Sequence, residues 1–180
     1  MSRSLIALAA LATISAPAFA QGLYADAGYT FINIDVDEPG VSGDVDLGAL
    51  AGHVGYNFSE WFALEGEALI GVQDEDASFG GINASVGLNY LVGAYAKRQV
   101  PLGERVNLYA RAGLVQAEIE ADVSGGGFSG SDSATESGVG YGAGGEFMLT
   151  PALGIRGDYT RYDIDDTEAD AFTVAAVFRF

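Results

Sequence analysis

The sequence predicts an all-β protein whose fold class is an eight-stranded antiparallel transmembrane β-barrel. Three observations lead to this prediction: apolar and polar residues alternate, short and long connections alternate, and lysine is almost absent. The alternation is clearest in residues 171–180, where every second residue belongs to one apolar face: Phe172, Val174, Ala176, Phe178 and Phe180. Because side chains of a strand point alternately to its two faces, a period of two predicts a strand with one apolar side.

The same alternation recurs along the chain and predicts eight strands. Their ranges are 22–34, 47–58, 62–71, 82–96, 106–118, 139–149, 154–162 and 171–180. In the strand at 82–96, Leu88 and Val92 are expected on the apolar face, and Asn89 and Tyr95 on the opposite face. A membrane-spanning strand needs about 9–11 residues, which most of these segments supply.

The predicted connections alternate in length. Three are short, after Phe58, over 97–104 and after Leu149, and four are long and acidic, over 35–46, 72–81, 121–138 and 163–170. An even number of strands joined in this way is typical of outer-membrane barrels, with short turns in the periplasm and long loops outside.

The first residues of the chain predict a secretory leader before the strands. Residues 1–20 combine Arg3, a short apolar run and an Ala18-x-Ala20 cleavage site, which predicts a signal peptide. We therefore expect a mature protein that begins at Gln21, with residues 21–180 forming one barrel domain in the bacterial outer membrane. The chain contains no Cys, so this exported domain has no disulfides.

The composition excludes some partners. The chain has 8 Lys+Arg and 25 Asp+Glu, a net charge of -17, which argues against binding the phosphates of nucleic acid. It has 26 Gly, which suits the narrow interior of a small barrel.

A soluble barrel such as a lipocalin would place the apolar face inside, and the charges favour the opposite arrangement. The sequence has one Lys, Lys97, which we assign to a periplasmic turn, whereas a water-facing surface would carry many. The charges on the polar face are isolated and of both signs. We expect them to form a polar network in the lumen: Glu65, Glu67, Arg111, Glu146, Arg156 and Asp158.

Several short motifs resemble those of one known family. They are Gly55-Tyr56-Asn57-Phe58, Leu64-Glu65-Gly66-Glu67, Tyr109-Ala110-Arg111-Ala112-Gly113 and the terminal Phe180. In this order they resemble the small outer-membrane β-barrel family, which includes the transmembrane domain of outer-membrane protein A, outer-membrane protein X and the opacity-type porins.

The resemblance also implies partners. The terminal Phe180, with Phe178 and Phe172, would be the signal read by the barrel assembly machinery. Other implied partners are periplasmic chaperones, outer-membrane lipid and lipopolysaccharide, and the protein would be a monomer. In outer-membrane protein A, interior ion pairs are thought to gate a narrow pore, which would make Glu65, Arg111, Glu146 and Arg156 the counterparts here.

The sequence predicts no catalytic, cofactor or metal site. His53 is the only His, and neither a Cys nor a Gly-x-Ser-x-Gly elbow accompanies it. The acidic runs at 35–38 and 163–170 keep binding of divalent cations as an alternative, because hard cations prefer clustered carboxylates. Neither run has the pattern of an EF-hand. We expect a non-enzymatic barrel that contributes to envelope integrity or surface interaction. A small ion-conducting channel is the alternative, and a soluble or periplasmic binding barrel is a third hypothesis.

Overall fold

The structure is a computed structural model that describes residues 22–38, 41–79, 82–125, 128–165 and 167–180. The expected leader and Gln21 lie outside these residues. The described strands are β1 (Leu23–Glu38), β2 (Val41–Asn57), β3 (Phe62–Gln73), β4 (Glu75–Phe79), β5 (Ile82–Leu102), β6 (Val106–Gly125), β7 (Phe128–Met148), β8 (Leu153–Ile164) and β9 (Thr167–Arg179). Within the described ranges, no helix is long and apolar enough to cross a membrane.

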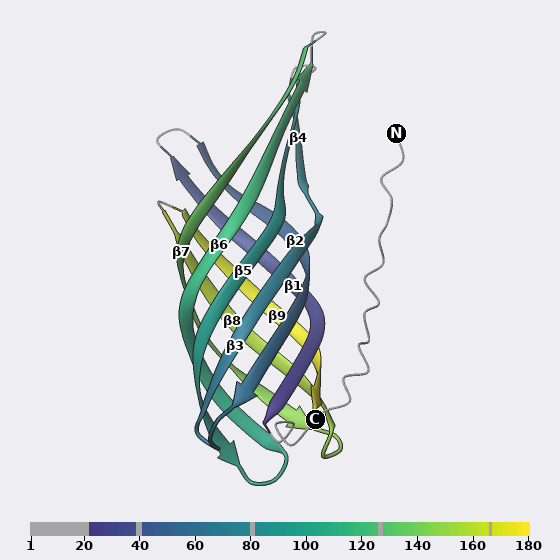
Figure 1. Ribbon diagram of the computed structural model, residues 1–180. Coiled ribbons are helices and arrows are strands. Elements are labelled where there is room, and N and C mark those ends of the chain that lie inside the picture. Colours follow the sequence, from purple (N-terminus) through teal and green to yellow (C-terminus); the bar gives the residue numbers. More distant parts are fainter. Residues whose placement is uncertain (1–21, 39–40, 80–81, 126–127, 166) are drawn as a thin grey trace.

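The strands close into a barrel (Figure 1). Their order is β3-β2-β1-β9-β8-β7-β6-β5-β4, all neighbours are antiparallel, and β3 also pairs with β5. Both β3 and β4 pair with β5, so the two segments form one strand that is interrupted at Asp74. The nine segments thus form eight strands around the barrel, and the predicted fold class is confirmed.

The outer surface of the barrel is apolar. Leu114 is 71% exposed and Leu64 is 61% exposed, and they belong to a large set of exposed aliphatic and aromatic side chains. Soluble proteins rarely expose apolar patches of this extent, whereas a membrane barrel presents such a band to lipid. The predicted outward direction of the apolar face is confirmed, which rules out the lipocalin-like arrangement.

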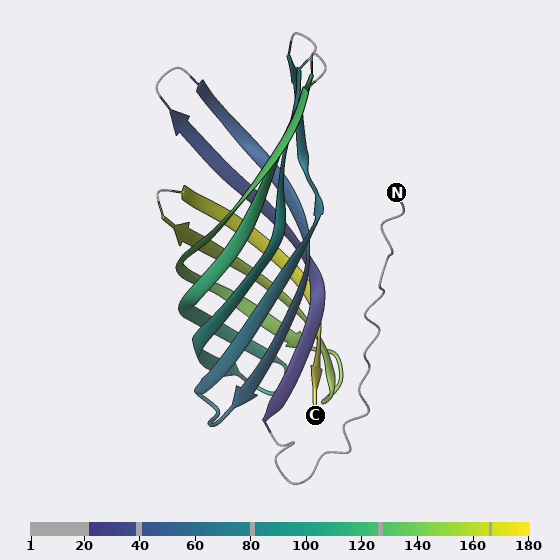
Figure 2. The same ribbon diagram turned by 45° about the horizontal axis from the view of Figure 1, so that its top comes forward.

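The prediction of four long loops was wrong. The four acidic segments are largely strand: β6 and β7, for example, stay paired up to Gly125 and Phe128. The hydrogen bonds between strands are made by the main chain, so a strand can continue through residues with polar side chains. Where the residues are polar on both faces, the strand extends beyond the bilayer into water. The extended parts of β4 to β7 form a tall sheet opposite the turns (Figures 1 and 2). We name it the outer wall: β4 with residues 82–89, 118–125 and 128–137.

A β-bulge reverses two predicted orientations in β5. The register with β6 shifts between Leu88 and Tyr90, which adds one residue to β5. Leu88, predicted to face outward like Val92, is only 8% exposed and packs in the interior, while Asn89, predicted on the inner face, is exposed. A single extra residue switches the alternation, which the sequence pattern does not reveal.

Lys97 does not lie in a turn, contrary to our prediction. Strand β5 continues to Leu102, and Lys97 lies on its inner face with 1% exposure. Pro101 and Gly103 correctly mark a turn nearby, but the ladder to β6 persists as far as Leu102 and Val106.

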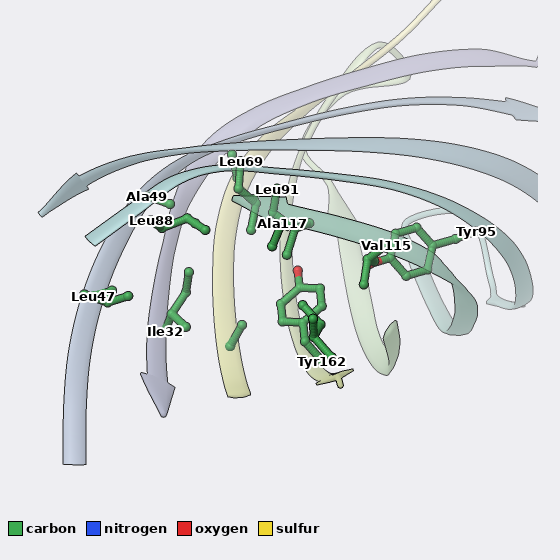
Figure 3. Packing of buried hydrophobic residues seen from close by; sticks show 13 residues of the cluster. Ile32, Leu47, Ala49, Leu69, Leu88, Leu91, Tyr95, Val115, Ala117 and Tyr162 are labelled. Atoms are coloured by element: carbon green, nitrogen blue, oxygen red, sulfur yellow. The ribbon is translucent and has the colours of Figure 1, made fainter. Parts of the chain in front are cut away.

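The interior has two levels, and only one of them is polar as predicted. Figure 3 shows buried apolar side chains from several strands that meet inside the barrel. This interior apolar cluster comprises Ile32, Leu47, Ala49, Ala51, Leu69, Leu88, Leu91, Tyr95, Val115, Ala117, Tyr162, Ile164 and Ala171. Along β1 and β3, which run away from the turns, Ile32 follows Asp26 and Leu69 follows Glu67. The cluster therefore lies on the extracellular side of the charged residues.

Candidate functional site

Charged side chains fill the half of the lumen nearer the periplasm. All six residues predicted for this network lie on inner faces and are at most 5% exposed. The structure adds three further buried members, Asp26, His53 and Lys97. We name these nine residues the lumen network: Asp26, His53, Glu65, Glu67, Lys97, Arg111, Glu146, Arg156 and Asp158.

Glu65 is the centre of the lumen network. Its Oε2 accepts a hydrogen bond from Arg156 Nη1 at 2.8 Å, and its Oε1 accepts one from Arg111 Nη1 at 3.0 Å. The Tyr24 hydroxyl donates to Oε2 at 2.6 Å, and Lys97 Nζ lies 3.4 Å from the same oxygen. Three cations from three strands thus share one carboxylate, so Glu65 links β5, β6 and β8 to β3 across the lumen.

Arg156 joins three acids across the lumen. Its Nε lies 2.8 Å from Asp158 Oδ2 on the same strand, and its Nη1 lies 2.9 Å from Asp26 Oδ2 on β1. Its two terminal nitrogens also bind both oxygens of Glu65. Such fork-shaped contacts are the strong form of an ion pair because they fix the guanidinium plane as well as its charge.

Glu67 receives a second group of donors. Arg111 Nη2 lies 2.6 Å from its Oε2, and the hydroxyls of Tyr95 and Tyr162 donate to its Oε1 at 2.8 and 2.9 Å. The Arg111 guanidinium also stacks over Tyr95, 4.5 Å from the ring centroid. Tyr95 and Tyr162 belong to the interior apolar cluster, so these two tyrosines connect the charged level to the apolar level.

His53 is held between two carboxylates. Its Nδ1 lies 2.5 Å from Asp26 Oδ1, and its Nε2 lies 2.8 Å from Glu67 Oε2. Because a neutral imidazole donates only one N–H, two carboxylate partners favour the imidazolium form. Neither ring nitrogen is free to take a proton from a nucleophile, so the geometry gives His53 a structural role.

Lys97 completes the network on the periplasmic side. Its Nζ lies 2.6 Å from Glu146 Oε1 and 4.0 Å from the centroid of the Tyr109 ring. Glu146 also binds Arg179 Nη2 at 2.7 Å, near the end of β9. With Arg179, the five acids of the network face five basic side chains, so each acid of this level has a basic partner within ion-pair distance.

The sequence pattern missed some members for identifiable reasons. Asp26 and His53 lie on the inward faces of their strands, as the alternation of residues predicts. However, a single acid or His on a polar face does not indicate which residue it will pair with. Lys97 lies two residues from both Tyr95 and Gln99 and therefore on the same face of the strand. The sequence would have placed Lys97 in the lumen if the predicted strand had been extended past Ala96. Among the described residues, no group of three or more His, Cys, Asp or Glu side chains is arranged to hold a metal ion.

The three aromatic residues predicted as an assembly signal lie on the outer face of the last strand or directly after it. Phe172 and Phe178 are 50% and 49% exposed, and Phe180 is 65% exposed. The Phe180 N–H also donates to the carbonyl of Leu23 at 3.1 Å, next to the β1–β9 seam that closes the barrel.

We predict that Phe180→Ala slows assembly more than it destabilises the folded barrel, because the ring contributes little buried area but lies in the terminal aromatic pattern. Pulse-labelled cells should show delayed appearance of the heat-modifiable, folded band, while the urea midpoint of purified protein stays nearly unchanged. Phe58→Ala is the matched control because Phe58 is also a largely exposed aromatic residue, 58% exposed compared with 65% for Phe180. Equal yields of folded wild type and variant in cells would contradict the prediction.

Comparison with known proteins agrees with the barrel fold. Residues 6–180 match the family described as the outer membrane protein β-barrel domain. The chain belongs to this family. It is accordingly a bacterial outer-membrane β-barrel protein with transmembrane strands.

Three solved structures of bacterial proteins share the fold. Ail, the attachment invasion locus protein of Yersinia pestis, is 21% identical, with a TM-score of 0.67 over 89% of this chain and 99% of that one. Neisserial surface protein A is 17% identical, with a TM-score of 0.61 and coverage of 88% and 97%. The N-terminal barrel of Pseudomonas aeruginosa OprF is 16% identical, with a TM-score of 0.54 and coverage of 89% and 98%. No curated protein sequence matches the chain.

Proposed function

We propose that this protein is a non-enzymatic, ion-tight outer-membrane barrel that acts in surface interaction through its outer wall. The single observation that carries the proposal is the filled lumen, in which a level of paired charges lies on the periplasmic side of an apolar level. If the interior of the barrel is closed, the polar groups that can contact other molecules lie on the extracellular parts of the strands.

The two levels together argue against the channel alternative. An ion that entered from the periplasm would have to displace paired charges such as Arg156 and Glu65, which are 2% and 3% exposed. It would then meet Leu69, Leu91 and the rest of the interior apolar cluster, where nothing replaces its hydration shell. The isolated charges that suggested a constriction in the sequence therefore favour a structural plug.

The outer wall supports a role at the cell surface. Strands β5, β6 and β7 have 21, 20 and 21 residues, compared with 12 and 13 for β8 and β9. About 9–11 residues suffice to cross a bilayer, so the additional length is not required for insertion. Ordering that much exposed chain costs conformational entropy, which an interaction partner would help to offset.

Two measurements test the proposal. Wild-type protein in planar bilayers should give no stepwise conductance. For the second, residues 121–132 are replaced by Asn-Gly; since Ala121 pairs with Asp132, this shortens the β6–β7 hairpin without changing the register below it. Cells with the shortened hairpin should lose adhesion to protein-coated surfaces but keep wild-type resistance to detergent.

Each of three other results would count against the proposal. Wild-type single-channel currents would favour the ion-conducting alternative. Detergent sensitivity in the shortened variant, with adhesion unchanged, would favour a role in envelope integrity. Full adhesion together with full resistance would remove the outer wall from the function.

A further inference from the structure

A cavity opens at the periplasmic end of the barrel, where the turns lie in Figure 1. Its volume is about 400 Å³, within the roughly 300–1,000 Å³ that is typical of pockets for small molecules. Residues 59–60 and 103–105 of two turns belong to its rim, and Gln99 and Asn107 belong to its wall. Because Gln99 follows Lys97 by two residues on the inner face of β5, the cavity lies on the periplasmic side of the lumen network. We name it the periplasmic vestibule.

Three amide side chains form a hydrogen-bonded row along the wall of the vestibule. Asn57 Nδ2 donates to the main-chain carbonyl of Gly22 at 3.2 Å, and Gln99 Nε2 donates to Asn57 Oδ1 at 2.8 Å. Asn107 Nδ2 then donates to Gln99 Oε1 at 2.9 Å. Because a carbonyl can only accept, Gly22 fixes the direction in which the Asn57 amide faces, and each amide fixes the next. We name Asn57, Gln99 and Asn107 the amide row.

The amide row ends on an acceptor that has no partner. Asn107 is 8% exposed, and its Oδ1 is one of two buried polar side-chain atoms that lack a hydrogen bond in the part of the chain that the structure describes. The other is the hydroxyl of Tyr109, a residue that is not part of the vestibule wall. Reversing the Asn107 amide would set two oxygens against each other, so the free group must be an acceptor. An unsatisfied buried acceptor costs free energy, which a donor on a ligand would recover.

The charges near the vestibule restrict the kind of ligand that fits. An anion is disfavoured because the free group of the amide row is itself an acceptor. A cation is disfavoured because the inward acid beside the row is already occupied: Glu146 pairs with Asn107 in the β6–β7 ladder, and its carboxylate binds Lys97 and Arg179. Among the described residues, no acidic group is arranged to hold a metal ion. The favoured ligand is therefore neutral and carries O–H or N–H donors.

We propose that the periplasmic vestibule binds a neutral sugar unit. A sugar can donate a hydroxyl or acetamido proton to Asn107 Oδ1 and accept bonds from the second N–H of each amide in the row. Its C–H faces can pack on the apolar part of the wall, which includes Leu23, Val106 and Phe180. The lumen network closes the barrel above this site, so the sugar is bound and not transported. The site lies at the end of the barrel opposite the outer wall and does not depend on the surface role.

The test uses the full barrel in nanodiscs and the β-1,4-linked disaccharide of N-acetylglucosamine as the probe, followed by NMR saturation transfer. Wild type should bind the disaccharide saturably. Asn107→Leu keeps much of the side-chain volume but removes the acceptor, and it should bind at least roughly tenfold more weakly. Tyr109→Phe removes the other unpartnered group, outside the vestibule wall, and should bind like wild type. N-acetylglucosamine itself identifies the source: tighter binding of the disaccharide supports a glycan, and equal binding supports a free sugar.

A second arm keeps the inference testable if Asn107→Leu fails to give the heat-modifiable, folded band. The chain has no Cys, so Met148→Cys supplies a single thiol in the vestibule wall. The disaccharide should slow modification of this thiol by a water-soluble methanethiosulfonate, and glycerol at the same concentration should not. No saturable binding to wild type, equal binding to Asn107→Leu, or a thiol that the disaccharide leaves unprotected would each overturn the inference.

Discussion

Replacing Arg156 by Met is expected to lower the free energy of unfolding by about 3–5 kcal/mol, the range found when one partner of a buried ion pair is removed. Met preserves much of the side-chain volume, so the loss arises from charge and not from a cavity. Glu65, Asp26 and Asp158 would each lose a cation at 2.8 or 2.9 Å. Urea unfolding in detergent micelles measures the change.

Arg105→Met is the matched control because Arg105 lies exposed in the turn between β5 and β6. It should leave the unfolding midpoint within experimental error of wild type. Planar-bilayer conductance provides a second measurement. Because the lumen network is proposed to seal the barrel, Arg156→Met should give small current steps that Arg105→Met does not. An unfolding midpoint for Arg156→Met equal to that of the control would contradict the structural role of the network.

Gly28→Val is expected to be similarly damaging, with a loss of about 3 kcal/mol or failure to form the folded barrel. A Cβ at Gly28 would lie 2.1 Å from the carbonyl oxygen of Val174 and 2.6 Å from Cα of Ala175. Both contacts are main chain of β9, the strand that pairs with β1 to close the barrel, so no rotamer change relieves them. The two strands would have to separate at the seam.

Gly157→Val provides the control for this substitution. Gly157 also lies in a strand, β8, but a Cβ there meets nothing within 4 Å. Val has a high strand propensity and suits a lipid-facing position, so stability should stay the same or rise slightly. The fraction of each variant that shows heat-modifiable migration after refolding gives the comparison. Equal refolding of both variants would show that β1 and β9 tolerate a side chain between them.

The sequence alone determined which residues of most strands face lipid and which face the lumen. This succeeds because side-chain direction in a strand is a local property with a period of two, so Leu64 and Glu65 are separated by parity alone. The shortage of Lys and the isolated charges of both signs on the polar face then decided which face lies outside. All six predicted lumen residues follow from that argument.

Tertiary structure decided what local alternation cannot encode. The bulge beside Asn89 switched the parity of Leu88, and the persistence of the β5–β6 ladder moved Lys97 from a turn into the lumen. The acidic segments became strands because their partners across the hairpin hold them in register, not because of their own side chains.

Partner choice inside the lumen also depended on closure. Arg156 meets Glu65, 91 residues away in sequence, and Asp26, 130 residues away. The period-two alternation predicts that these side chains point inward. Barrel closure and the stagger between strands decide which of them lie at the same height in the lumen. Period-two alternation is a property of one strand, whereas register is a property of all eight together. For this reason the faces could be predicted from the sequence, and the ion pairs and the apolar plug could not.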